Sequence, residues 1–230
     1  EMATRLAYFL WNSPPDQRLL DLAASGTLNT PSVLQVEVNR MLADPKMDLF
    51  AENYSGQWLD SRLILSSSAV SKSSALYPEF TDAMRSDMKT ETDTFFSNLI
   101  YDKTTRAVSS ASPYDILSGN YTFINDRLAT QYGISGVTGS QFRRVSLTGT
   151  PRKGVTTQAS VLTTNATAVE SFPTRRGYWI LKKLTCNEPP PIPSNLVIPP
   201  LDANAQTLKE ALAAHRNNPQ CIGCHTTMDP

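Results

Sequence analysis

The sequence is short of the residue types that build several common kinds of protein. Its cysteines number only three, Cys186, Cys221 and Cys224, and an odd count excludes a framework in which every cysteine pairs within the chain. Its 21 Lys and Arg residues balance its 21 Asp and Glu residues, so there is neither a basic stripe for nucleic acid nor an acidic tail. No apolar run reaches about 18 residues, the length typical of a transmembrane helix. We therefore expect no nucleic-acid partner and no transmembrane helix in this segment.

The chain does have enough apolar content for a real core. Hydrophobic residues make up 40% of its 230 positions, which suits one large domain or two small ones. No signal-peptide pattern opens the chain. It begins at Glu1 inside a helical pattern and stops two residues after Met228, so we expect it to be a portion of a longer protein.

Helical periodicity dominates the first half. Apolar residues recur at intervals of three and four, the spacing of amphipathic helices. We predict helices over 2–11, 13–26, 30–45, 46–63, 78–101 and 123–132. Ser13 and Thr30 are the predicted N-caps of the second and third helices, and Gly26 and Gly133 follow two helix ends. The acidic and basic residues that alternate along 78–101 predict a solvated face on that helix.

The sequence pattern changes after Gly133. Residues 142–147 form a strand candidate, and 153–164 is rich in Val and Thr, which favours extended structure. Helical spacing returns over 175–186. The segment 187–200 holds so many prolines that regular helix is forbidden, and we predict an extended polyproline segment there.

These patterns predict a mainly α fold. We expect a helical domain over 1–138, followed over 139–230 by a second, smaller and irregular α+β domain. The second domain would contain a last helix over 204–216 and a C-terminal haem-binding motif.

That motif lies in the last ten residues, CIGCHTTMDP. Two cysteines separated by two residues and followed at once by histidine form the attachment signature of haem c. Two thiols can each add to a haem vinyl group, while the adjacent imidazole approaches the iron. We predict one haem c, with Cys221 and Cys224 as thioether anchors and His225 as the proximal iron ligand.

The sixth iron ligand stays open. His215 lies six residues before Cys221 on a predicted helix and is a candidate distal ligand. Met228 is a weaker candidate, because a residue three positions after His225 is too close to reach the opposite haem face. If no side chain binds, the iron is open to peroxide or oxygen, and the protein would be a haem peroxidase or oxygenase. Other methionines fall at helical spacing and are expected in the core: Met41, Met47, Met84 and Met88.

Cys186 provides a competing site. Three thiolates and one imidazole make a good tetrahedral set, so Cys186, Cys221, Cys224 and His225 could instead hold zinc or iron. Cys186 could also lie near the haem or join a partner by a disulfide, and burial is its default expectation. We find no catalytic triad, no phosphate-binding loop and no diagnostic carboxylate pair. An electron-transfer or accessory subunit is therefore expected rather than a catalyst.

Seven longer stretches carry a family resemblance. In the first half these are RLAYFLWNSPPDQRLLDLAASGTL, RMLADPKMDLFAENYSGQWLD, YPEFTDAMRSDMKTETDTFF and NYTFINDRLATQYGI. In the second half they are RKGVTTQASVLT, PTRRGYWILKKLTCNEPPP and AHRNNPQCIGCHTTMDP. Together they resemble two consecutive domains of unknown function in large exported proteins of planctomycetes and related bacteria. The resemblance implies an exported, haem-associated protein in a family where cytochrome c modules often occur; it implies no enzyme reaction.

The functional expectation is one-electron transfer through a single haem c in a periplasmic or extracellular protein, because bacteria assemble haem c after export. Its partners would be a redox protein or other haem subunits, within a larger protein or complex. The alternative is an accessory or structural subunit of an envelope assembly with a zinc or iron site. The large helical portion ahead of one haem favours that alternative, because a minimal electron carrier needs less protein.

Overall fold

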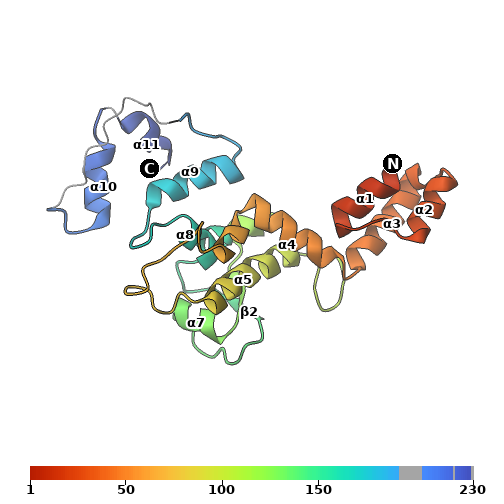
Figure 1. Cartoon of the computed structure of the whole chain (residues 1–230), viewed down its shortest axis with the longest axis horizontal. Coiled ribbons are helices and arrows are strands. Elements are labelled where there is room, and N and C mark those ends of the chain that lie inside the picture. The colour runs from red at the N-terminus through yellow and green to blue at the C-terminus, as the bar shows by residue number, and fades with distance from the viewer. Residues whose placement is uncertain (192–203, 220, 229–230) are drawn as a thin grey trace. The chain divides into compact units, whose positions relative to one another are not determined.

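The computed structural model describes residues 1–191, 204–219 and 221–228, and it divides into two compact units, Glu1–Thr164 and Asn165–Pro230 (Figure 1). Helices dominate both units, which confirms the predicted mainly α class. Unit 1 contains α1 (Met2–Trp11), α2 (Gln17–Ala24), η1 (Thr27–Asn29), α3 (Pro31–Ala43), α4 (Met47–Trp58), η2 (Ser61–Leu65), α5 (Asp82–Ile100), α6 (Asp115–Ser118), β1 (Tyr121–Ile124), α7 (Asp126–Tyr132), β2 (Arg143–Ser146), η3 (Val155–Thr157) and α8 (Ala159–Thr164). Unit 2 contains α9 (Pro173–Leu184), α10 (Leu208–Arg216) and α11 (Ile222–Met228).

The boundary between the two compact units falls between Thr164 and Asn165 in the sequence. The predicted change of domain between residues 138 and 139 therefore falls inside unit 1. The strands β1 and β2 lie on either side of that position in the sequence and pair with each other, so they belong to one unit.

The N-terminal helices begin where side-chain acceptors are available for their free amides. Asp16 caps α2, and its carboxylate accepts the Leu19 amide at 3.0 Å. The predicted cap Ser13 is wrong, because Pro14, Pro15 and Asp16 lie between it and Gln17, the first helical residue. Thr30 is the N-cap of α3 as predicted, although its side chain makes no capping hydrogen bond.

These helices enclose a first hydrophobic cluster around Trp11. Its indole is fully buried and donates a hydrogen bond to the Met41 carbonyl oxygen at 3.0 Å. The other buried members of this cluster are Ala3, Ala7, Leu10, Leu19, Leu28, Met41, Met47 and Tyr101. A second cluster contains Met84 and Met88, so the four methionines predicted for the core are all buried.

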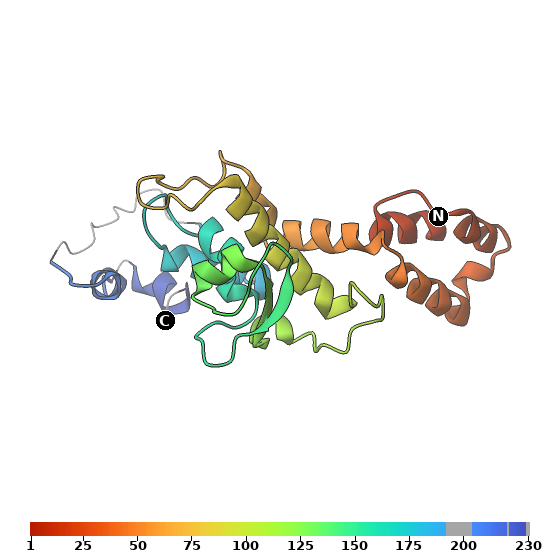
Figure 2. The ribbon, with the colours of Figure 1, turned by 90° about the horizontal axis from the view of Figure 1, so that it is seen from below.

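Helix α5 is the central element of unit 1, in contact with α4, η2, β1, α7 and α8 (Figures 1 and 2). The predicted solvated face is wrong, because these neighbours bury its charged residues Arg85, Asp87, Glu91 and Asp93. Arg85 donates to the Ile64 carbonyl oxygen at 2.8 Å, and Asp87 pairs with Arg127 at 2.9 Å. Charges removed from water in this way require such partners.

The sheet of unit 1 is an antiparallel pair in which Tyr121 lies opposite Ser146 and Ile124 opposite Arg143. The helix predicted over 123–132 is therefore wrong at its start, and it begins only after Asn125, whose side chain accepts the Leu128 amide at 3.1 Å. The predicted extended structure over 153–164 is also wrong. That segment forms η3 and α8 because packing against η2 and α5 outweighs its Val and Thr content.

Unit 2 is built on α9, with α11 in contact with both α9 and α10. Trp179 of α9 is buried. The chain leaves α9 through Cys186, whose positive φ of 53° ends the helical path. Residues 187–191 have no regular structure, and the rest of the predicted polyproline segment, 192–200, lies outside the described residues. Among the helices of the described ranges, none combines the length and apolar character that crossing a bilayer requires.

Candidate functional site

Helix α11 carries the CxxCH motif on a single turn. Cys221 precedes the helix, and its carbonyl oxygen accepts the amide of Cys224 at 3.2 Å and that of His225 at 3.1 Å. Side chains three and four residues apart on a helix share one face. The structure therefore brings Cys221, Cys224 and His225 to one side of α11.

The chemistry of these three residues fits haem c. Both cysteines are free thiols, as thioether formation requires, and one imidazole follows directly. Their exposure differs: Cys221 is only 6% exposed, Cys224 is exposed and His225 is half-buried. A group bound here would lie partly at the surface.

The described structure does not test the two candidates for the sixth ligand. Met228 is half-buried at the end of α11, one turn after His225 on the same helix. His215 lies in α10, but its side chain is outside the described residues. Both remain predictions.

Cys186 lies at the surface, which corrects the expectation that it is buried. It follows α9, whereas the other two thiols belong to the α11 turn. In the part of the chain that the structure describes, no group of three His, Cys, Asp or Glu side chains is gathered as a metal site would need. The four residues considered for a Cys₃His site are thus not gathered into one in the described structure.

Gly177 of α9 approaches the end of α11 closely, and sequence reasoning missed this contact. A Cβ atom at this position would lie 1.7 Å from the Met228 carbonyl oxygen of α11. The available signal was a lone glycine inside a helical pattern, which usually has a packing reason.

A second unusual group is Glu91, in the interior of unit 1. Its side chain is fully buried and accepts hydrogen bonds from the Thr122 hydroxyl at 2.6 Å and the Tyr132 hydroxyl at 2.5 Å. Burial raises the pKa of Glu91 to about 7, and the two hydrogen bonds and the charge of Arg152 offset only part of that rise. Glu91 can therefore take up a proton near neutral pH.

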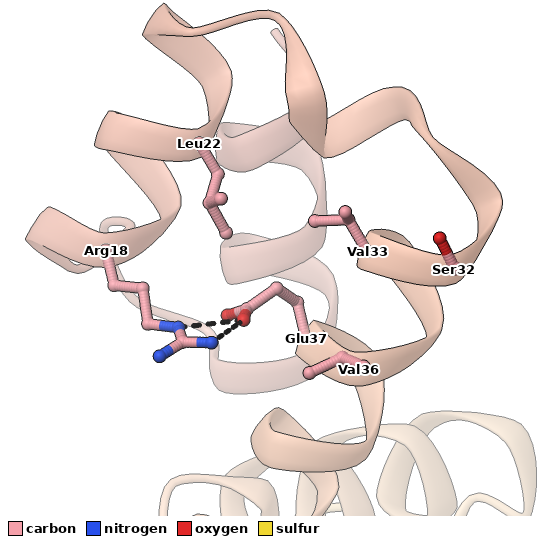
Figure 3. A pocket seen from close by; sticks show the side chains of 6 residues that line it. All are labelled: Arg18, Leu22, Ser32, Val33, Val36 and Glu37. Carbon is pink, nitrogen blue, oxygen red and sulfur yellow. Dashed lines mark hydrogen bonds and ion pairs between the residues drawn. The ribbon is translucent and has the colours of Figure 1, made fainter.

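A cavity of about 360 Å³ lies between α2 and α3 (Figure 3). Its lining residues are Arg18, Leu22, Ser32, Val33, Val36 and Glu37. The charges of Arg18 and Glu37 are paired with each other at 2.6 Å, and Arg40 also pairs with Glu37 at 2.8 Å. None of the predicted site residues lines this cavity, and its paired charges offer a ligand little unsatisfied polarity.

Comparison with known families matches the chain in two consecutive parts. The family PSD4, a protein of unknown function (DUF1592), matches residues 1–134. The family PSCyt3, a protein of unknown function (DUF1588), matches residues 152–230, and its name suggests an association with cytochromes. The predicted boundary at 138 and 139 lies between the two matches, and the resemblance to two consecutive domains of unknown function is confirmed.

No curated protein and no solved structure matches the chain. The first family match alone covers more than half of the sequence, and the second follows it in the order expected from the motifs. The chain belongs to the PSD4 (DUF1592) family of proteins of unknown function.

Proposed function

We propose that Cys221, Cys224 and His225 attach one haem c, and that the chain serves one-electron transfer in an exported protein. It would act in the periplasm or outside the cell, as part of a larger protein or complex with redox partners. The observation that carries this proposal is the placement of two free thiols and one imidazole on a single turn of α11.

The attachment chemistry needs no oxidant. The S–H bond of each thiol adds across one haem vinyl group, so that sulfur bonds to one carbon and hydrogen to the other. Cys221 and Cys224 would supply the two thioether links, and His225 would supply a nitrogen ligand to the iron. A bound haem supplies a one-electron iron couple, and the exposed position of Cys224 keeps the site near the surface.

Attachment is tested on the full chain exported from a host that matures haem c. We expect a haem spectrum in alkaline pyridine that survives acid–acetone extraction, and an intact mass raised by one haem. The double variant Cys221→Ala with Cys224→Ala should lose both signals. Cys186→Ala is the matched control, because it removes the third thiol and should keep the haem.

A haem-free wild-type protein that binds zinc or iron, and loses it with Cys186→Ala, would contradict the proposal. It would instead support the accessory subunit with a Cys₃His site. If haem is attached, the spectrum of the oxidised protein reports the sixth position. Low-spin iron that becomes high-spin in His215→Ala or Met228→Ala identifies the ligand, and high-spin wild-type iron favours peroxide or oxygen chemistry.

A further inference from the structure

We propose that Gly177 is a positioning residue of the attachment site, an inference that rests on the function proposed above. Helices α9 and α11 pack directly against each other. A Cβ atom on residue 177 would lie 1.7 Å from the carbonyl oxygen of Met228 and 2.6 Å from its carbonyl carbon. Both distances are far shorter than van der Waals contact, and the atoms met belong to the backbone. Only glycine permits this crossing.

The glycine is otherwise out of place in α9. Glycine is a poor helix former, because it gives up more backbone freedom on folding than residues with a side chain. Gly177 lies in the interior of a helix that spans Pro173–Leu184. The close approach of α11 is a physical reason for a glycine there.

The crossing lies one helical turn from the attachment residues. Met228 follows His225 by three positions and Cys224 by four. Because the contact is between backbones, no change of side-chain rotamer can relieve it, and a displacement at Met228 is transmitted along the short helix. Gly177 therefore sets how the turn with Cys224 and His225 is presented to one haem.

The test compares Gly177→Ala with Gly223→Ala in the full chain, exported from a host that matures haem c. Gly223 occupies one of the two free positions of the CxxCH motif, and a Cβ atom there would meet nothing within 4 Å. We expect Gly177→Ala to lower the fraction of chains with attached haem several-fold. It should also shift the reduction midpoint of the chains that are loaded, whereas Gly223→Ala matches the wild type. A role in stability alone would lower the loaded fraction and leave the midpoint of the loaded chains unchanged.

A second measurement does not depend on haem. In the haem-free full chain, Cys221 is 6% exposed and Cys224 is exposed, so iodoacetamide should modify Cys224 first. Gly177→Ala should raise the rate at Cys221 toward that at Cys224, and Gly223→Ala should not. Wild-type loading, midpoint and thiol protection in Gly177→Ala would overturn the inference.

Two further outcomes are also decisive. If the wild type takes up no haem, the proposed function fails, and thiol protection alone decides whether Gly177 positions the CxxCH turn. If Gly177→Ala yields no folded protein, amide hydrogen exchange is measured in the wild type instead. Exchange around Gly177 that slows on haem attachment supports the inference, and unchanged exchange overturns it.

Discussion

Unit 1 and unit 2 differ in how many side chains they bury. Unit 1 contains two hydrophobic clusters, and it also encloses charged side chains such as Glu37 and Glu91. In the described ranges of unit 2, the buried residues are only Asn165, Trp179, Ala211 and Cys221. A small unit with so little core is marginally stable, and small units often rely on a bound group or a cross-link. The unit with the CxxCH motif would thus gain most from the covalently attached haem proposed above.

The two units also differ in whether their charged side chains are buried or exposed. Unit 1 pairs carboxylates inside its core, where burial and hydrogen bonds move their pKa values in opposite directions. Unit 2 has an exposed pair between Lys182 and Glu188 at 2.6 Å. Because water screens the exposed pair, perturbing it should matter far less than perturbing the buried groups.

The largest effect is expected from a substitution in the core of unit 1. Phe95 in α5 is 1% exposed, and its ring centroid lies 5.4 Å from that of Tyr121. Phe95→Ala removes buried surface and leaves a cavity, so the free energy of unfolding of unit 1 should fall by about 3–5 kcal/mol. Urea denaturation of the full chain, with amide exchange in α5 as the local probe, measures this.

The control for that change is Tyr114→Ala, at a residue 81% exposed. It should alter the free energy of unfolding by about 0.5 kcal/mol or less. Haem loading of unit 2 should be unaffected by both variants. A parallel loss of haem in Phe95→Ala would show that haem attachment depends on the core of unit 1.

The next effect is a pH dependence from Glu91. Its pKa is about 7 in the folded chain, against an ordinary value of 4.5, so the folded state holds its proton more tightly than the unfolded state does. Stability from this group is complete below pH 4.5 and is lost as the pH rises to about 7. The loss amounts to about 3–4 kcal/mol, because the two pKa values differ by about 2.5 and each pKa unit corresponds to about 1.4 kcal/mol.

Glu91→Gln isolates this contribution, because a neutral amide cannot ionise. The free energy of unfolding of the wild type, minus that of Glu91→Gln, should fall between pH 4.5 and 7. A difference that is flat or rises across this window would refute the assignment of a buried, protonated carboxyl.

Glu37 should show the opposite sign with a smaller effect. Burial opposes its ionisation, but hydrogen bonds from Arg18 and Arg40 outweigh that cost and hold the pKa of Glu37 below its ordinary value. The group stabilises the fold above pH 4.5, and this contribution is lost as the pH falls through the folded pKa. Glu37→Gln should cost about 1–3 kcal/mol at pH 7, because both arginines lose their charged partner.

Thermal denaturation of Glu37→Gln between pH 3 and 7 checks this, with Gln35→Glu as an exposed control on the same helix α3. The variant should approach the wild type at low pH. If the stability difference between Glu37→Gln and the wild type closes entirely above pH 6, the arginine pairing does not hold the pKa of Glu37 below its ordinary value.

The smallest effect is expected in unit 2. Glu188 accepts hydrogen bonds from the Tyr178 hydroxyl and the Lys182 ammonium, each at 2.6 Å, and these bonds are exposed. Glu188→Gln should leave the thermal midpoint unchanged at physiological salt, since exposed pairs contribute little there. A clear loss of stability in differential scanning calorimetry would mean that unit 2 depends on its surface contacts more than its core suggests.

Much of the local structure could be predicted, and much of the interior could not. Helices α1, α3 and α5, the Thr30 N-cap and the turn at Gly133 follow from spacing and capping residues within a few positions. The CxxCH turn follows for the same reason. The burial of Glu91 could not be predicted, because its partners Thr122 and Tyr132 lie 31 and 41 residues further along the chain.

The amino-acid sequence by itself determined helices α1, α3 and α5 and which three residues share the turn at the C-terminus, because those depend on neighbours along the chain. Tertiary structure alone decided that the charges of α5 are enclosed, that Cys186 lies at the surface and that α9 crosses α11 at Gly177. The physical reason is that burial and close approach depend on which distant segments cover a residue. Periodicity along one segment carries no information about that cover.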